Sequence, residues 1–310
     1  MILKRYLNLA ILVLVNFLWA AQYPAYKIAS DHMSPATLNF WTLFCSALLL
    51  MPFLLLSARR SKEPRPRIDA RAAWDFILLG IFGILPPSLL LSWGISRSTA
   101  SNAAIVQLTV PVLMVLMAMV LLGERATPLR IASLVIALGG TVLTSRSDLS
   151  GDIVNTRMLV GNIVVFLSGF GSAFYNTYSK RVLSRFGELR VLLYTYIVAC
   201  AGCALISLFD GSPFFRLHGY PQSVWLSIGV LGAFTWGIAM VLWMWVLNRL
   251  EAIQVSVSIY MLSIFGVVLS AVTLGERLHF PQIAGGLMVF VATFLTSEYE
   301  ARRKSGTAGC

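Results

Sequence analysis

The chain has 310 residues, of which 58% are hydrophobic and only 12% are charged. This composition leaves too few polar side chains to cover a water-soluble domain, so it excludes a soluble globular protein. The net charge of +11 does not indicate nucleic-acid binding, because the basic residues lie in short breaks between apolar runs rather than on one folded domain. The expected partner is the lipid bilayer and not nucleic acid.

Apolar runs near the ~20 residues needed to span a bilayer recur along almost the whole chain, so we predict an all-α membrane protein with ten transmembrane helices. The predicted spans cover residues 7–29, 35–57, 74–94, 98–122, 128–145, 158–179, 189–209, 222–247, 252–274 and 280–297. Lys4 and Arg5 precede the first run as in a signal peptide. That run is longer than the ~7 to 15 apolar residues of such a signal, which favours a first span.

The basic residues predict the orientation in the membrane. When Lys and Arg are assigned to alternate loops, 18 fall on the side of the amino terminus and six on the other side, which accounts for all 24. The positive-inside rule then places both termini in the cytoplasm. We therefore expect a multi-pass protein of a bacterial inner membrane.

An internal repeat divides the chain. Moving residues 98–145 forward by 152 positions without a gap superposes three identical blocks, of which the longest is Leu122–Arg125 on Leu274–Arg277. A shift of 153 superposes Ala20 on Ala173 and Lys27 on Lys180. We predict a first repeat over residues 1–150 and a second over 151–310.

Each predicted repeat holds five spans, and this odd number requires the second repeat to enter the membrane from the opposite face. Inverted repeats are typical of transporters that bind a substrate near the midplane between the two halves. A duplicated scaffold without transport is the alternative.

Several motifs resemble those of the EamA branch of the drug/metabolite transporter superfamily, which has ten spans. The fourth span begins with small residues at Ser98–Ala104, contains Pro111 in its middle and closes with a Gly-Glu-Arg turn. Asn16–Ala20, followed by Lys27, is similar to the first-span signature of that family. The likeness extends over nearly the whole chain.

The chain departs from the family pattern at two positions. Ser263 stands where the second repeat usually has the proline that matches Pro111, and Trp41 lies near where many members have an arginine. Members of the family mostly export amino acids and other metabolites, although some import vitamins or sugars. The resemblance therefore implies transport and leaves the substrate class open.

Glu124 and Glu276 follow the matched glycines, and each precedes a proline near the start of the next span. An acid at that place favours the positive end of the following helix, so a structural turn is the preferred interpretation. The alternative is a carboxylate that transfers protons. Since no other acidic residue lies deep within a predicted span, proton antiport of the small multidrug resistance type is disfavoured.

The span interiors contain aromatic, amide and hydroxyl side chains suited to a neutral or zwitterionic solute. Amides have no hydrogen-bond partner in lipid, so they should face the bundle interior, where they either bind cargo or bridge helices. For the tryptophans, packing or anchoring at the membrane interface is the alternative to binding cargo. The candidate substrate-binding residues are Trp19, Gln22, Tyr23, Asn102, Gln107, Tyr175, Asn176, Trp236 and Tyr260.

Four prolines fall within predicted spans, namely Pro24, Pro86, Pro87 and Pro111. Each frees a backbone carbonyl about one turn earlier and bends its helix, which produces either a cargo site or a static kink. We favour the pair Pro86-Pro87 as the hinge of a gate. Lys27, one turn beyond Pro24, either attracts a carboxylate or extends to the lipid headgroups.

The spans contain no nucleophile–base pair, histidine cluster or paired carboxylates, so the sequence predicts no enzyme, metal site or cofactor. The function predicted is export of small metabolites such as amino acids by alternating access. An importer of a vitamin or other nutrient is the first alternative, and an intramembrane enzyme or scaffold is the second. The sequence does not distinguish a monomer from a homodimer.

Overall fold

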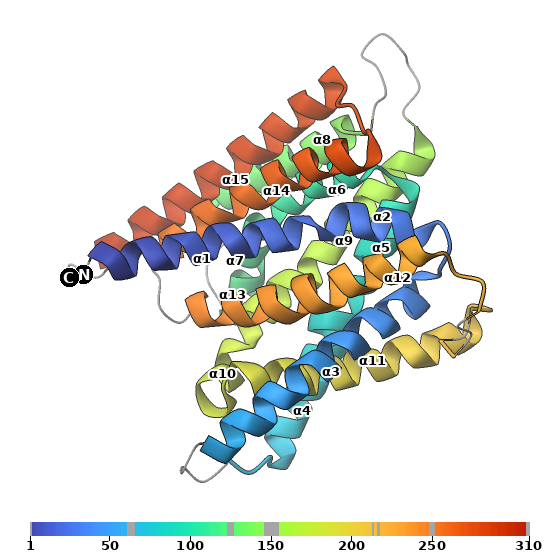
Figure 1. The fold of residues 1–310 in the computed structure, drawn as a ribbon. Helices are drawn as coiled ribbons and strands as arrows, with labels where there is room; N and C mark the ends of the chain where they lie inside the picture. The colour runs from blue at the N-terminus through green and yellow to red at the C-terminus, as the bar shows by residue number, and fades with distance from the viewer. Residues whose placement is uncertain are drawn as a thin grey trace.

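The structure is a computed structural model that describes residues 2–60, 66–122, 127–145, 155–212, 214–215, 218–247 and 252–307. Helices form the bundle shown in Figure 1, and no strand occurs in these ranges. The all-α prediction is confirmed for this part of the chain. The first residues of α1 and the last of α15 lie at the same end of the molecule, here called the terminal end (Figure 1).

The helices of the first predicted repeat follow its five expected spans. They are α1 (Ile2–Ala20), α2 (Gln22–Ser30), α3 (Pro35–Arg60), α4 (Ala70–Leu78), the π-helix η1 (Leu79–Ile84), α5 (Leu85–Arg97), α6 (Ala100–Val106), the 3₁₀-helix η2 (Gln107–Thr109), α7 (Val110–Leu122) and α8 (Pro128–Leu143).

The second predicted repeat shows the same succession of long helices. They are α9 (Thr156–Tyr178), α10 (Lys180–Phe186), α11 (Glu188–Phe209), α12 (Gln222–Gly229), the π-helix η3 (Val230–Ala239), α13 (Met240–Leu247), α14 (Ala252–Leu274) and α15 (Phe280–Thr307).

Six helical segments of the described chain are long and apolar enough to cross a membrane. They are Pro35–Leu56, Ala70–Arg97, Ala100–Met117, Thr156–Tyr178, Glu188–Phe209 and Gln222–Val246, with shorter apolar helices at Ile131–Leu143, Tyr260–Leu274 and Phe280–Leu295. The multi-pass architecture follows from these segments. Ten crossings and the orientation of the termini remain predictions.

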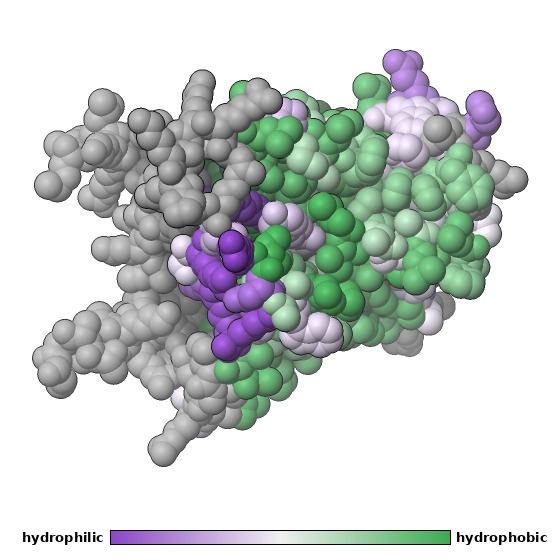
Figure 2. Space-filling model, turned by 90° about the horizontal axis from the view of Figure 1, so that it is seen from below, coloured by the Kyte–Doolittle hydropathy of each residue, from purple (hydrophilic) through white to green (hydrophobic). Residues whose placement is uncertain are grey.

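The outer surface of the bundle is apolar. Figure 2 shows a broad hydrophobic area over much of the face in view, with hydrophilic residues in one patch beside the grey atoms and a few more at the upper right edge. Large apolar side chains are exposed on several helices, including Leu48 at 64%, Val135 at 62% and Leu287 at 60%. An apolar surface of this extent is stable in contact with lipid and not in water.

Local sequence signals set the helix boundaries. Pro35 and Pro128 occupy the first positions of α3 and α8, where a missing N–H costs nothing. Asp69 caps α4, and its carboxylate accepts from the Ala72 N–H at 2.9 Å. This bond, together with the Arg185 guanidinium 3.1 Å away, holds the pKa of Asp69 below its usual value.

The two predicted repeats pack closely against each other. Helix α1 packs on α14, α3 on α11, α5 on α9, and α8 on α15. The last pair depends on glycines, because a Cβ on Gly140 would lie 2.6 Å from the Gly285 carbonyl oxygen. Close backbone approach at small residues is a common basis of helix association in membranes. Gly285 therefore serves a contact within one chain.

Gly140→Ala should destabilise the α8–α15 contact, because the new methyl group meets backbone that has no room to move. We expect a loss of about 1–3 kcal/mol, seen as a lower melting temperature in detergent. Gly139→Ala is the matched control, since its Cβ would lie 3.5 Å from the end of the flexible Met288 side chain. Equal melting temperatures for the two variants would contradict this account of the contact.

Candidate functional site

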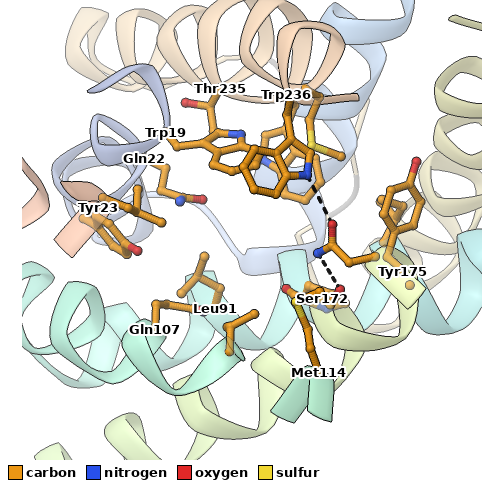
Figure 3. A pocket seen from close by; sticks show the side chains of 18 residues that line it. Trp19, Gln22, Tyr23, Leu91, Gln107, Met114, Ser172, Tyr175, Thr235 and Trp236 are labelled. Atoms are coloured by element: carbon orange, nitrogen blue, oxygen red, sulfur yellow. Dashed lines mark hydrogen bonds between the residues drawn. The ribbon is translucent and has the colours of Figure 1, made fainter. Parts of the chain in front are cut away.

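A cavity of about 130 Å³ lies in the middle of the bundle, where both predicted repeats contribute (Figure 3). This volume is far above the ~10–15 Å³ that a single water molecule requires. The lining residues are Trp19, Gln22, Tyr23, Gly83, Ile84, Pro87, Leu91, Gln107, Val110, Met114, Ser172, Tyr175, Asn176, Thr235, Trp236, Met240, Trp243 and Leu262.

The helices that line the cavity are irregular where they pass it. Pro24 follows the break at Ala21 between α1 and α2, and Pro111 follows the 3₁₀ turn η2. Pro86 and Pro87 follow the π-helix η1. Proline has no N–H for the carbonyl one turn earlier, so each of these irregularities has a local cause in the sequence.

A second π-helix, η3, borders the cavity without a proline in it. It begins at Val230 and η1 begins at Leu79, a separation of 151 residues that is close to the repeat offset. Two glycines of η3 pack tightly against α3: a Cβ on Gly232 would lie 2.9 Å from the Cys45 side chain, and one on Gly237 would lie 3.0 Å from the Leu49 side chain.

The lining residues of the two predicted repeats correspond in sequence. At an offset of 152 the pairs are Gly83 with Thr235, Ile84 with Trp236, Leu91 with Trp243, and Val110 with Leu262; at an offset of 153 they are Trp19 with Ser172, Gln22 with Tyr175, and Tyr23 with Asn176. Equivalent positions of the repeat therefore meet at the cavity.

Some polar groups at the cavity are already paired. The Trp243 indole donates to the Asn176 side-chain oxygen at 3.2 Å, and the Asn176 amide donates to the Ser172 carbonyl at 2.9 Å, as the dashed lines in Figure 3 mark. The Gln107 amide donates to the Ser168 hydroxyl at 3.0 Å. Helix bridging is thus one role of Asn176 and Gln107.

Other polar groups at the cavity have no hydrogen bond to any described residue. The Tyr23 side chain is fully buried, and its hydroxyl is unpartnered within this part of the chain. The Trp19 indole and the Gln22 amide, on the same stretch beside the break at Ala21, likewise make none there. A buried hydroxyl without a partner loses the hydrogen bonds that water would give it, so the Tyr23 hydroxyl lowers the stability of this conformation.

Two candidate binding residues lie away from the cavity. The Asn102 amide donates to the Thr144 carbonyl at 3.0 Å and joins α6 to the turn that follows α8. The Tyr260 ring packs 4.8 Å from the Phe290 ring, in a small apolar cluster with Leu108 and Val289. The sequence gives the helix on which each residue lies but not the direction in which its side chain points.

The sequence predicts that Glu276 lies at the start of the helix that follows it, and the structure places its carboxylate elsewhere. Its carboxylate accepts from the backbone N–H groups of Ala100 and Ser101, at 2.9 and 2.8 Å, so it lies at the start of α6 and not at the helix that follows it. Gly275 has φ of +67°, which a turn built on glycine allows. Glu124 lies outside the described residues.

Lys27 takes neither of its two predicted roles. Its ammonium group donates to the carbonyls of Ser98 at 2.7 Å and Ile95 at 3.2 Å, at the end of α5. A cation at the carboxyl end of a helix satisfies carbonyls that have no partner in the helix itself.

Part of the cavity lining lies outside the candidate binding residues. Ser172 and Thr235 line the cavity, and applying the repeat offset to Trp19 and Gly83 identifies both. Trp243 is one of four tryptophans in the eighth span, where packing is the alternative role. Met114 and Met240 have no such signal, since apolar residues fill both helices.

Comparisons with known proteins extend over nearly all of the chain. The sequence profile of the EamA-like transporter family matches residues 7–146 and again residues 159–298. The uncharacterized transporter YyaM of Bacillus subtilis is 21% identical over 94% of each chain, and the probable terminal-alkyne amino-acid exporter of Streptantibioticus cattleyicolor is 27% identical over 96% of each. A solved crystal structure with 18% identity aligns over 95% of this chain and 97% of that chain, with a TM-score of 0.64.

Tyr23→Phe should leave the melting temperature in detergent unchanged or raise it, because it removes a buried hydroxyl that has no partner in the described chain. Tyr26→Phe is the matched comparison. The Tyr26 hydroxyl, also fully buried, donates to the Asn39 side chain at 2.8 Å and accepts from the Trp236 indole at 3.0 Å. Its loss should cost about 1–3 kcal/mol. If Tyr23→Phe destabilises as much as Tyr26→Phe, the Tyr23 hydroxyl has a partner in the free protein.

Proposed function

We propose, because this chain belongs to the EamA-like transporter family, that it exports a small zwitterionic metabolite such as an amino acid across the plasma membrane. The chain is a multi-pass membrane transporter and not an enzyme. The proposal concerns the cargo, the direction and the site that binds the cargo.

The observation that supports a zwitterionic cargo most directly is the chemistry of the cavity. No charged side chain of the described chain lines it, whereas amide, indole and hydroxyl groups do. A net charge on the cargo would remain uncompensated in such a site, at a large cost in free energy. A zwitterion has no net charge, and hydrogen bonds with dipolar groups stabilise each of its ends.

The free groups beside the break at Ala21 suit a carboxylate. The Trp19 indole and the Tyr23 hydroxyl are hydrogen-bond donors, and the Gln22 amide both donates and accepts. Across the cavity, Pro86 and Pro87 leave carbonyls of η1 without their usual donors, next to Gly83. Carbonyl oxygens accept hydrogen bonds from an ammonium group, so the two sides complement the two ends of an amino acid.

The apolar part of the cargo would lie against aromatic rings. The rings of Trp19 and Trp243 lie 4.8 Å apart with their planes tilted by 51°, and the Trp236 and Tyr175 rings also line the cavity. Such rings offer a large apolar area with few rotatable bonds. We therefore expect amino acids with apolar side chains to bind better than glycine or charged amino acids.

We propose that the cargo crosses by alternating access between two inverted five-helix repeats, residues 1–150 and 151–310, with both termini in the cytoplasm. Three observations support this topology: the unequal distribution of basic residues, the recurrence of the family profile at an offset of 152, and the matching positions of η1 and η3. Inverted repeats provide two related shapes that open one central site to either side.

Export is favoured over import by one relative. The Streptantibioticus cattleyicolor protein, which is 27% identical over 96% of each chain, is named a probable amino-acid exporter. Identity at this level leaves the cargo itself unassigned.

Counterflow in proteoliposomes tests the function. Vesicles loaded with one of a series of amino acids should accumulate the same labelled amino acid in a saturable manner, most strongly for those with apolar side chains. Gln22→Ala should raise the half-saturating concentration roughly tenfold to a hundredfold, because a hydrogen bond to a charged group is worth about 1.5–3 kcal/mol.

Gln222→Ala is the matched control, since Gln222 is exposed at the start of α12 and away from the cavity. If no amino acid shows saturable counterflow while a vitamin or sugar does, the proposed cargo class is wrong. Uptake of the amino acid by intact cells, with no efflux from cells that were loaded with it beforehand, would overturn the proposed direction.

Replacing both Pro86 and Pro87 by alanine tests the proposed gate hinge. The two new N–H groups should strengthen the helix at η1 and slow the change between the two shapes. Maximal exchange should fall roughly tenfold, the effect of ~1.4 kcal/mol on a barrier. Pro52→Ala is the control, because Pro52 is an exposed proline inside α3. Unchanged exchange with normal expression of the double variant would refute the hinge.

A further inference from the structure

A short connection between α5 and α6 lies between two opposite charges. Residues Ser98 and Thr99 form this connection, and α6 begins at Ala100. Lys27 donates to the last carbonyls of α5, and Glu276 accepts from the first N–H groups of α6. We call this arrangement the Glu276 clamp, and the end of the bundle that holds it the Glu276 end.

The Glu276 carboxylate makes charge-assisted hydrogen bonds with two backbone N–H groups of α6. Each oxygen of the Glu276 carboxylate accepts one backbone N–H, from Ala100 at 2.9 Å and from Ser101 at 2.8 Å. Thr99 caps the next N–H of α6, that of Asn102, at 3.0 Å. Ionised partners make such bonds roughly twice as strong as neutral ones, and the helix dipole adds to the attraction.

The clamp connects the two predicted repeats. Glu276 belongs to the second repeat, and the α6 residues that it binds are 175 and 176 positions earlier in the first. Two further bonds join the same regions: the Ser263 hydroxyl donates to the Ala104 carbonyl, and the Ser98 hydroxyl donates to the Asn162 side-chain oxygen. Together these bonds join the two repeats at this end of the bundle.

The clamp lies directly beyond the cavity. Lys27 is one helical turn past Tyr23, α5 runs from Pro87 through Leu91 to the connection, and α6 leads back to Gln107. In the other direction the lining reaches Asn176 in the last turn of α9 and Trp243 in α13. Helix α13 packs along the second half of α1, whose first residues lie at the terminal end.

We propose that Glu276 is a positioning residue of the transport cycle: its carboxylate, with Lys27 opposite, holds α6 over the cavity, and its release opens the cavity at the Glu276 end. This inference rests on the proposed transport function. It gives Glu276 a gating role through helix N–H groups that needs no proton transfer by its carboxylate.

Labelling of a single cysteine tests the gate without any cargo. Leu91→Cys, in a background in which the four native cysteines are replaced, places a thiol on the cavity wall near the clamp. A membrane-impermeant thiol reagent applied from the Glu276 end should label it slowly. With Glu276→Ala the labelling rate from that end should rise roughly tenfold or more, because two charge-assisted hydrogen bonds are lost.

Three controls define the result. Arg277→Cys, an exposed neighbour of Glu276, identifies the side of the membrane on which the Glu276 end lies. Asp210→Asn removes an exposed carboxylate at the end of α11 that does not act on Lys27, and it should leave the labelling rate unchanged. Glu276→Gln retains one acceptor and should give an intermediate rate; it also replaces Glu276→Ala if the latter does not fold.

If Glu276 holds the gate closed, its replacement should speed labelling from the Glu276 end and should not speed labelling from the terminal end. Unchanged labelling in the folded Glu276 variants, or an equal increase from both ends with a lower melting temperature, would overturn it. Because labelling requires no transported solute, a failed counterflow assay with intact gating would refute the proposed cargo and leave the gate in place.

Discussion

The requirement that every backbone N–H and C=O be satisfied away from water governs this structure. In lipid only continuous helices meet that requirement without help from other groups. The described chain interrupts its helices at Ala21, η1, η2 and η3, and residues beside or within each interruption line the cavity. Irregular backbone therefore occurs where other polar groups, or a bound solute, are available to replace the lost hydrogen bonds.

The same requirement explains where the charges lie. Lys27 and Glu276 satisfy carbonyl and N–H groups at the ends of α5 and α6, and Asp69 caps α4. Each is a charged group at the helix end whose partial charge is opposite to its own. The cavity holds no charge from the described chain, so the charged side chains of the clamp lie at the end of the site and not inside it.

Hydropathy and the repeat predict much of the fold. Seven of the nine candidate binding residues, which are polar or aromatic side chains within the predicted spans, line the cavity. The prolines also predict where three of the four helix irregularities lie. Asn102 and Tyr260 lie away from the cavity, because rotation about the helix axis decides which way a side chain points, and hydropathy that is high all round a helix does not record that rotation. The partner of Glu276 was missed for a different reason: its carboxylate reaches a helix 175 residues away, beyond the range of local capping rules.

The repeat gives the two sides of the cavity equivalent backbone positions but different side chains. Trp19 corresponds to Ser172, Ile84 to Trp236, and Leu91 to Trp243, so a large ring usually faces a smaller group at the related position. The unequal side chains make the two sides of the cavity chemically different: the Tyr23 hydroxyl has no partner in the described chain, whereas Asn176, at the related position of the second repeat, is hydrogen-bonded to Ser172. Such an uneven lining would favour one orientation of a solute whose two ends differ.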